Sequence, residues 1–475
     1  MQGDEARAAC LIRHGAKQAG LTDARLADDH CDPPTAATGV REHVANGRYL
    51  RLATDEGGAD DVVVQVHETR CLGVETESMA RPTTITQMIV RFGPIAVSIA
   101  VLVAMPGVPW HAHLGAQIPT SRDTIISAPT LAPRTPLPSE AATARVTRFS
   151  FISYGDTRGR RDGSELQAEH ALVIESMLAT IKRSATDGDS IRFVLQSGDA
   201  VVNGAIARQL NVSYIPLINR LTQEGDVPYL LAVGNHDVSS STDLRDPRRI
   251  DGLHNYFATN VNLIPAEGSP RRLRGYPTYA FGYGNTFFIA FDSNIPDDTV
   301  QLAWVKSQLE GLNRSRYVNV AVFFHHPPFS SGPHGGARIE PQAASIRAKW
   351  MPLFRRHHVR LLLTGHEHLY EHWVERYVDS TGAHRIDEIV SGGGGAPLYA
   401  YTGEPDLSEY VRLAGQQVTF EHVARPSIEP GGNPFHYVVV HVDGARISLE
   451  VIGVDWGRGF APYRSSLTSL SDARP

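Results

Sequence analysis

Short apolar runs alternate with segments of helical periodicity from about residue 147 onward. The apolar runs are Phe149–Tyr154, Ile191–Gln196, Tyr229–Val233, Phe287–Phe291, Val318–Phe324 and Leu361–Leu363. The clearest helical pattern runs from Ser164 to Arg183, where apolar residues such as Val173 and Met177 share one face. Ser164 and Gln167 have the spacing of a capping box. Strands that alternate with helices predict an α/β architecture.

The C-terminal part of the same region predicts a β-hairpin. Tyr437–Val442 and Ile447–Val451 are apolar runs on either side of Asp443-Gly444, and an Asp-Gly pair is a strong two-residue turn signal. Helix-flanked sheets packed as a sandwich accommodate both the hairpin and the alternating elements. We therefore predict one large α/β domain over residues 147–457, followed by a tail at 458–475.

The first 78 residues show no sustained helical or strand periodicity, and Val62–Val66 is their only clear strand candidate. Few aromatic residues and many Ala, Arg, Gly, Asp and Thr residues are typical of a poorly ordered extension. A second interpretation is that residues 1–78 are not native coding sequence.

The next segment, 79–116, has the pattern of a secretory signal peptide. Met79 and Met88 precede Arg91, the run Phe92–Met105 carries no charge, and Pro106 and small residues follow. The run is shorter than the roughly 20 apolar residues of a membrane span. A signal peptide is favoured, which predicts a secreted or periplasmic protein. Two alternatives stay open: an uncleaved membrane anchor through 92–105, with the α/β domain outside, and a buried helix.

Residues 117–146 are rich in Pro, Thr, Ser and Ala, which predicts an extended linker. The formal net charge of −6 gives no sign of a nucleic-acid-binding surface, which needs a basic face. The three cysteines, Cys10, Cys31 and Cys71, all precede the α/β region. That region therefore offers neither a thiol nucleophile nor a thiolate metal ligand.

Polar motifs of metal-ligand residue types follow most of the predicted strands. They are Gly155-Asp156-Thr157-Arg158, Gly198-Asp199, Gly234-Asn235-His236-Asp237, His325-His326-Pro327 and Gly365-His366-Glu367-His368. Ligands of open α/β sheets bind outside the carboxyl ends of the strands, so these distant motifs can converge on one site. Carboxylate, imidazole and amide donors suit Zn, Mn or Fe. Two divalent ions sharing a carboxylate would supply hydroxide near neutral pH and clamp a phosphoryl group.

With these motifs in this order, residues 148 to 400 resemble the calcineurin-like metallophosphoesterases, including the purple-acid-phosphatase branch. Gly234–Asp237 and Gly365–His368 are the most specific matches, and the second continues as Leu369-Tyr370-Glu371, like the acid-phosphatase pattern. Gly198–Gly204 matches the family's Gly-Asp-x4-Gly. The resemblance implies the αββα two-sheet sandwich of the metallophosphoesterase type, and two metal ions.

The resemblance also implies a role for each residue. Asp199 would bridge the two ions. Asp156 and His368 would bind the first ion, and Asn235, His325 and His366 the second. His236 would lie over the substrate phosphate as a general acid or charge stabiliser, with Asp237 orienting it.

The chain departs from the family at the first metal site. The commonest pattern places a histidine where this chain has Arg158, and the purple enzymes use a tyrosine where it has Val202. We therefore expect a weaker first metal, unless Asn203 or water completes the site. Arginine cannot be a ligand because it stays protonated, but its fork matches phosphate. Arg158 is thus a predicted substrate contact and catalytic residue.

Three further features allow more than one interpretation. His326 could contact substrate or support the metal ligands, and His334 fits a solvent-exposed histidine better than a residue at the rim of the site. The run Gly392–Gly395 lacks the Lys-Ser/Thr of a phosphate-binding loop, so a tight turn is the favoured interpretation.

Three functions stay open at this stage. Acid-phosphatase-like details favour hydrolysis of phosphate monoesters by metal-bound hydroxide. A phosphodiesterase for cyclic nucleotides or phospholipid head groups is the second. A non-catalytic metal-binding surface module is the third, favoured only by Arg158 in place of a ligand. The predicted partner is a small-molecule or lipid phosphate ester.

Overall fold

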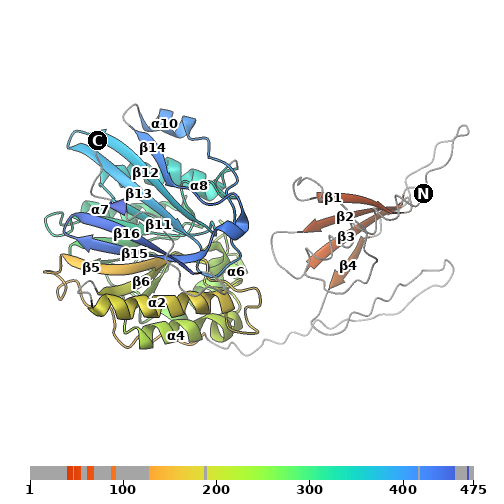
Figure 1. Cartoon of the computed structure of the whole chain (residues 1–475), viewed down its shortest axis with the longest axis horizontal. Helices are drawn as coiled ribbons and strands as arrows, with labels where there is room; N and C mark the ends of the chain where they lie inside the picture. Colours follow the sequence, from red (N-terminus) through yellow and green to blue (C-terminus); the bar gives the residue numbers. More distant parts are fainter. Residues whose placement is uncertain are drawn as a thin grey trace, which may run out of the picture. The chain divides into compact units, whose positions relative to one another are not determined.

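The computed structural model divides the chain into two units, Met1–Gln117 and Ile118–Pro475. In the second unit the structure describes residues 128–186, 190–336, 338–415 and 418–454, together with the backbone of a short strand at 468–469. In the first unit it describes the backbone of four strands (Figure 1).

Those four strands form an antiparallel sheet in chain order. They are β1 (Val40–Ala45), β2 (Arg48–Thr54), β3 (Asp61–Glu68) and β4 (Gln87–Arg91). The predicted strand Val62–Val66 falls within β3 and is confirmed. The remaining residues of 1–78 and the apolar run Phe92–Met105 lie outside the described residues, so the signal peptide and the membrane anchor stay predictions. No helix among the described residues is long and apolar enough to cross a membrane.

The second unit contains two sheets. The six-stranded sheet has the order β17-β16-β15-β5-β6-β7, and the seven-stranded sheet β14-β12-β13-β11-β10-β9-β8. The strands of the first are β5 (Arg148–Tyr154), β6 (Ile191–Gln196), β7 (Tyr229–Leu231), β15 (Phe435–Asp443), β16 (Arg446–Val454) and β17 (Thr468–Ser469). Those of the second are β8 (Tyr279–Tyr283), β9 (Thr286–Ala290), β10 (Asn319–Phe323), β11 (Leu361–Thr364), β12 (Tyr370–Asp379), β13 (Gly382–Ser391) and β14 (Thr419–Ala424).

Each sheet contains a run of parallel strands, which in the six-stranded sheet ends at the edge strand β7. The strands β5, β6 and β7 pair in parallel, as do β9, β10, β11 and β13. These parallel strands are buried on both faces, which explains their continuous apolar sequences. The predicted hairpin around Asp443-Gly444 is confirmed as β15–β16, with Gly444 at a φ of 62° in the turn.

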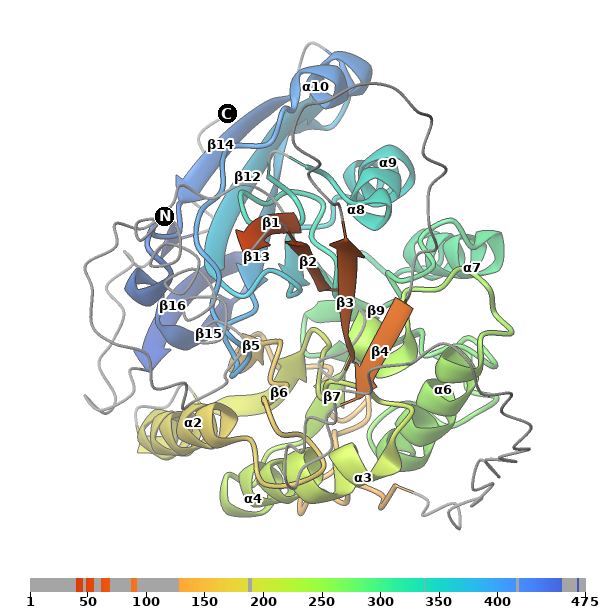
Figure 2. The ribbon, with the colours of Figure 1, turned by 90° about the vertical axis from the view of Figure 1, so that its right-hand side faces the viewer.

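The two sheets pack face to face between helices, which confirms the αββα sandwich (Figures 1 and 2). Phe151 of β5 meets Phe288 of β9 edge to face, with ring centroids 5.3 Å apart. Helices α2 (Ala168–Thr186) and α4 (Ile215–Glu224) cover the six-stranded sheet, whereas α7 (Thr299–Glu310) and α9 (Met351–Arg356) cover the other. The remaining helical segments are α3 (Ala207–Gln209), η1 (Leu210–Tyr214), α5 (Asn235–Val238), α6 (Pro247–Asn260), α8 (Pro341–Ser345), η2 (Ile346–Trp350), α10 (Ser408–Ala414) and η3 (Pro430–Gly432).

Two predictions from the sequence need correction. The helix predicted from Ser164 begins at Ala168, because the Gln167 side chain donates to the Ala200 carbonyl and to Asp162 instead of closing a capping box. Part of the predicted linker packs against the domain: Leu131 is buried and its backbone N–H donates to the Thr259 carbonyl. The packed part of this unit therefore includes residues of the predicted linker, among them Ala128 and Leu131.

Candidate metal centre

The five polar motifs meet at the carboxyl ends of the parallel strands. Asp156 follows β5, Asp199 follows β6, and Asn235 opens α5 shortly after β7. His325 follows β10, and the pair His366 and His368 follows β11. Because β5–β7 and β9–β11 belong to different sheets of the sandwich, the site lies at the shared end of both sheets.

The Nε2 atom of His325 lies at the point where four of these side chains converge. It is 3.3 Å from Asp199 Oδ1, 2.9 Å from Asn235 Oδ1 and 3.1 Å from His366 Nδ1. Through His325, these contacts bring together residues as distant in the sequence as Asp199 and His366. Carboxylate, amide and imidazole donors that face one another at such distances form the environment of a divalent ion.

A second group of donors adjoins the first through Asp199. Asp156, Asp199 and His325 each offer a ligand atom, and these atoms lie within 4.8 Å of one another. His368 Nε2 lies 3.5 Å from Asp156 Oδ1. That oxygen is fully buried and accepts no hydrogen bond from the described part of the chain, so a cation would satisfy it. The donor set therefore fits divalent metal.

Each of the three imidazoles is held by its outer nitrogen. His325 Nδ1 is 3.1 Å from the Ser197 carbonyl, and His368 Nδ1 is 2.7 Å from the Pro397 carbonyl. His366 Nε2 is 2.9 Å from Glu340 Oε2. Since these nitrogens donate to oxygen, the inner nitrogens keep their lone pairs for a metal ion.

Burial controls the charge of these groups. It lowers the pKa of His325 and His368 well below the usual value, so both rings are neutral, as ligands must be. Burial and the nearby Asp199 carboxylate raise the pKa of Asp156 well above its usual value. Burial also acts to raise the pKa of Asp199, but His236 and Arg158 outweigh it and lower that pKa overall. Two buried carboxylates this close need neighbouring positive charge.

Unusual backbone conformations aim the ligands. Asp156, Asp199 and His366 have φ values of 61°, 57° and 68°, a region that non-glycine residues seldom adopt. Two glycines allow the close approach of the loops: a Cβ on Gly234 would clash with the Asp199 carboxylate, and one on Gly365 with that of Asp156.

His236 lies on the open side of the centre. Its Nε2 is 3.9 Å from Asp199 Oδ2, and 26% of its side chain is exposed. Its Nδ1 is 2.7 Å from the Val202 carbonyl, which orients the ring. The net effect of burial, opposed by Asp199, is a pKa of His236 below its usual value.

The expected orienting role of Asp237 is wrong. The Asp237 carboxylate accepts the backbone N–H groups of Asp199, Ala200 and Gly234 at 2.8, 2.9 and 2.8 Å. Burial and the neighbouring Asp199 raise its pKa to about 7. Asp237 therefore joins the Asp199 loop to the loop that carries Asn235, and the Val202 carbonyl performs the orientation of His236.

Arg158 lies beside Asp199 and His368. Its Nε is 3.7 Å from Asp199 Oδ2, and its Nη2 is 3.4 Å from His368 Nε2. Asn203 does not complete the first site, because its side-chain oxygen accepts the N–H of Ala205 within a turn.

The remaining histidines support the ligands. His326 is buried, its Nδ1 lies 2.9 Å from Ser293 Oγ, and its ring centroid is 4.5 Å from that of His366. This position favours the supporting role over substrate contact. His334 is not simply exposed, because its Nδ1 lies 3.3 Å from Glu367 Oε2 and its ring packs on His366.

Two supporting residues were missed in the sequence. Glu340 holds the outer nitrogen of His366, and Tyr399 stacks on His368 with ring centroids 4.1 Å apart. Neither has a role that the sequence predicts, and both come from irregular connections. The Gly392–Gly395 run packs against the first motif, where Gly394 N–H donates to the Gly155 carbonyl. This contact agrees with a close-packed turn.

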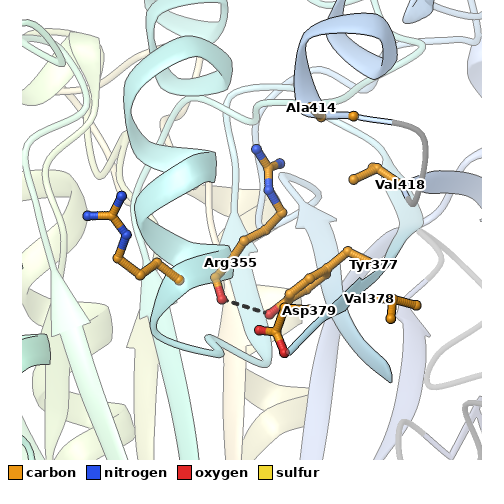
Figure 3. Close-up of a pocket in the computed structure, with 8 residues that line it drawn as sticks. Arg355, Tyr377, Val378, Asp379, Ala414 and Val418 are labelled. Carbon is orange, nitrogen blue, oxygen red and sulfur yellow. Dashed lines mark hydrogen bonds between the residues drawn. The ribbon is translucent and has the colours of Figure 1, made fainter. Parts of the chain in front are cut away.

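A groove of about 490 Å³ lies away from these residues, at the opposite end of β12 (Figure 3). Arg355 and Tyr377 line it, and the Tyr377 hydroxyl donates to the Arg355 carbonyl. The ten residues of β12 separate this groove from the His366–His368 turn by about 30 Å. It contains none of the predicted metal ligands.

Residues 174–370 match the family model of the calcineurin-like phosphoesterases. This region of the chain is a calcineurin-like phosphoesterase domain. The matched region of this phosphoesterase includes every candidate ligand from Asp199 to His368, and Asp156 precedes it.

Similar proteins have been found in several organisms. Two uncharacterized proteins of Mycobacterium tuberculosis are each 28% identical over 162 residues, which are 30% of the phosphoesterase and 27% of the relative. A purple acid phosphatase from yellow lupin seeds shares 17% identity at a TM-score of 0.45, covering 67% of this chain and 53% of its own. A dimetal phosphatase from Danio rerio shares 13% sequence identity at a TM-score of 0.37. The match covers 68% of this chain and 98% of the Danio rerio chain. The phosphoesterase thus spans about a quarter of the curated relatives it matches.

Proposed function

We propose that the phosphoesterase hydrolyses phosphate monoesters at a divalent-metal centre built around Asp199. The observation that carries the proposal is the convergence of Asp199, Asn235 and His366 on His325 Nε2. Bound divalent ions supply a water nucleophile near neutral pH and neutralise phosphate charge.

The donors divide into two sites that share Asp199. Asp156 and His368 would complete the first, and Asn235, His325 and His366 the second. Without thiolates among these donors, Zn, Mn and Fe are all compatible. Support for both sites comes from the outer hydrogen bonds of the imidazoles, which fix the ring orientations before any ion binds.

His236 is the general acid that protonates the leaving group. Val202 accepts from Nδ1, so the protonated ring presents Nε2–H on the open side of Asp199. There it can donate a proton to the departing alkoxide oxygen, a contribution of about 10²–10⁴-fold in rate.

Arg158 supplies fixed positive charge to the substrate phosphate. Its side chain is 20% exposed beside the Asp199 carboxylate, so one edge of the guanidinium can turn to an incoming anion. A planar guanidinium matches two phosphate oxygens at once. Arg158→Ala is expected to raise KM, and unchanged kcat/KM would contradict this role.

The test compares nitrophenyl phosphate with its bis-ester in the presence of manganese or zinc, before and after treatment with a chelator. Metal-dependent hydrolysis of the monoester at the higher kcat/KM supports the proposal. Preference for the bis-ester would instead favour a phosphodiesterase acting on cyclic nucleotides or phospholipid head groups. Absence of hydrolysis with metal bound would favour a non-catalytic metal-binding surface module.

Membership of the purple-acid-phosphatase branch rests on His368-Leu369-Tyr370-Glu371 and is part of this proposal. Secretion or periplasmic export through the segment 79–116 is a separate proposal, with attachment to the membrane as its alternative. N-terminal sequencing of exported protein tests it, and a mature chain that begins at Met1 contradicts it.

A further inference from the structure

The Arg158 guanidinium faces the same atoms that a first metal ion would use. Its Nη2 points to His368 Nε2 at 3.4 Å, and its Nε to Asp199 Oδ2 at 3.7 Å. Because His368 Nδ1 donates to the Pro397 carbonyl, Nε2 is the lone-pair nitrogen of that ring. The guanidinium therefore approaches the ligand atom itself.

The backbone keeps Arg158 in this position. The N–H groups of Thr157 and Arg158 both donate to the Asp199 carbonyl, at 3.0 and 3.2 Å. The Thr157 hydroxyl donates to the Ala200 carbonyl at 3.0 Å. The backbone of Arg158 is thus hydrogen-bonded to the loop that carries the shared carboxylate. This contact places the Arg158 side chain next to Asp199. Arginine cannot lose its charge in competition with a metal ion, because a guanidinium stays protonated in proteins.

The second site has no such competitor. Asn235, His325 and His366 face one another, and no arginine or lysine contact to them is found among the described residues. The nearest supporting charge is the Glu340 carboxylate on His366, which favours a cation. The first site thus has the positive charge of Arg158 beside it, whereas the second has the negative charge of Glu340.

We propose that Arg158 competes with the first metal ion for Asp199 and His368, so that the chain binds its two ions with unequal affinity. The second site holds one ion tightly, and the first site fills only when the guanidinium turns away. This inference rests on the proposed metal centre.

The experiment is a manganese titration of full-length, metal-free protein, followed by equilibrium dialysis and by the electron paramagnetic resonance of bound ions. All proteins carry His384→Ala, so that the partly exposed group of His358, Asp379 and His384 does not add to the number of bound ions. Wild type is expected to bind one ion tightly and the second at least tenfold more weakly. Arg158→His, which restores the family's ligand, and Arg158→Ala should bring the second dissociation constant within about tenfold of the first.

Two variants serve as controls. Arg158→Lys keeps a positive charge at the site and should retain the one-ion behaviour. Arg161→Ala removes an exposed arginine that pairs with Glu165 and should match wild type. When one ion more than the tight site holds is added per chain, Arg158→His should show magnetic coupling between paired ions. Wild type at the same ratio of metal to protein should show none.

Equal, tight binding of two ions by wild type would overturn the inference, whether or not the protein hydrolyses phosphate esters. Unequal binding without hydrolysis would overturn the proposed function and leave the inference standing. Thermal unfolding of each variant shows whether it is folded, and Arg158→His decides the question if Arg158→Ala is not.

Discussion

The Nε2 atom of His325 and the Nδ1 atom of His366 face each other at 3.1 Å, while the outer nitrogen of each ring is held by an oxygen. When each ring carries its one proton on the outer nitrogen, neither inner nitrogen can donate across this contact. A cation between them removes the repulsion of the two lone pairs. The contact therefore links metal binding to the stability of the domain.

Metal removal is expected to lower the melting temperature. The folded site binds the ion and the unfolded chain does not, so free metal at 100 times the dissociation constant adds about 2.7 kcal/mol of stability. At an unfolding entropy of about 2.1 cal/mol/K per residue, that corresponds to a rise of roughly 4 °C for a domain of this size. Calorimetry of chelator-treated protein with increasing manganese measures it. Asp199→Asn should abolish the rise; the same rise in that variant would contradict the shared role of Asp199.

His236→Asn is expected to lower kcat/KM by about 10²–10⁴-fold with metal content unchanged. A proton donor must be protonated, and burial holds the pKa of His236 below its usual 6.5. Activity should therefore fall as pH rises through a value below 6.5, and this alkaline limb should disappear in the variant. His254→Asn, at an exposed position of α6, is the control. If the alkaline limb persists in His236→Asn, a group other than His236 causes it.

Asp237→Ala is expected to destabilise the domain by about 3 kcal/mol or more, because three buried N–H groups lose their acceptor. Urea unfolding measures the loss, with the exposed Asp251→Ala as a control. The folded variant should keep the alkaline limb assigned to His236. If the limb vanished with little change in stability, Asp237 would be the residue that orients His236 after all.

Glu340→Gln is expected to weaken metal binding by about 10–100-fold, because the carboxylate that holds His366 Nε2 loses its charge. Metal titration measures this loss. The exposed Asp297→Asn, which removes an ion pair with Lys349 on the surface, should leave the affinity unchanged. Equal affinity in Glu340→Gln and Asp297→Asn would show that the Glu340 contact does not support the metal site.

Local sequence was sufficient to predict the strands of the parallel core and the polar motifs that follow them. Buried strands such as β5, β6 and β10 are continuous apolar runs, so their positions could be predicted within about two residues. The strands β12 and β13 could not be predicted, because they carry buried charged residues, including Glu371, Glu375 and Asp387. Their partners, such as Arg355 for Glu375 and His372 for Asp387, come from other elements.

The sequence determined which residue types follow the strands, and therefore that a metal-dependent phosphoesterase domain was to be expected. Only the tertiary structure decided which groups support them: Val202 rather than Asp237 orients His236, Glu340 holds His366, and Arg158 approaches His368. The reason is physical. Ligands at strand ends are brought together by the regular pleat and pairing of the sheets, which local sequence specifies. Supporting contacts depend on where irregular loops cross, and no short-range pattern encodes that.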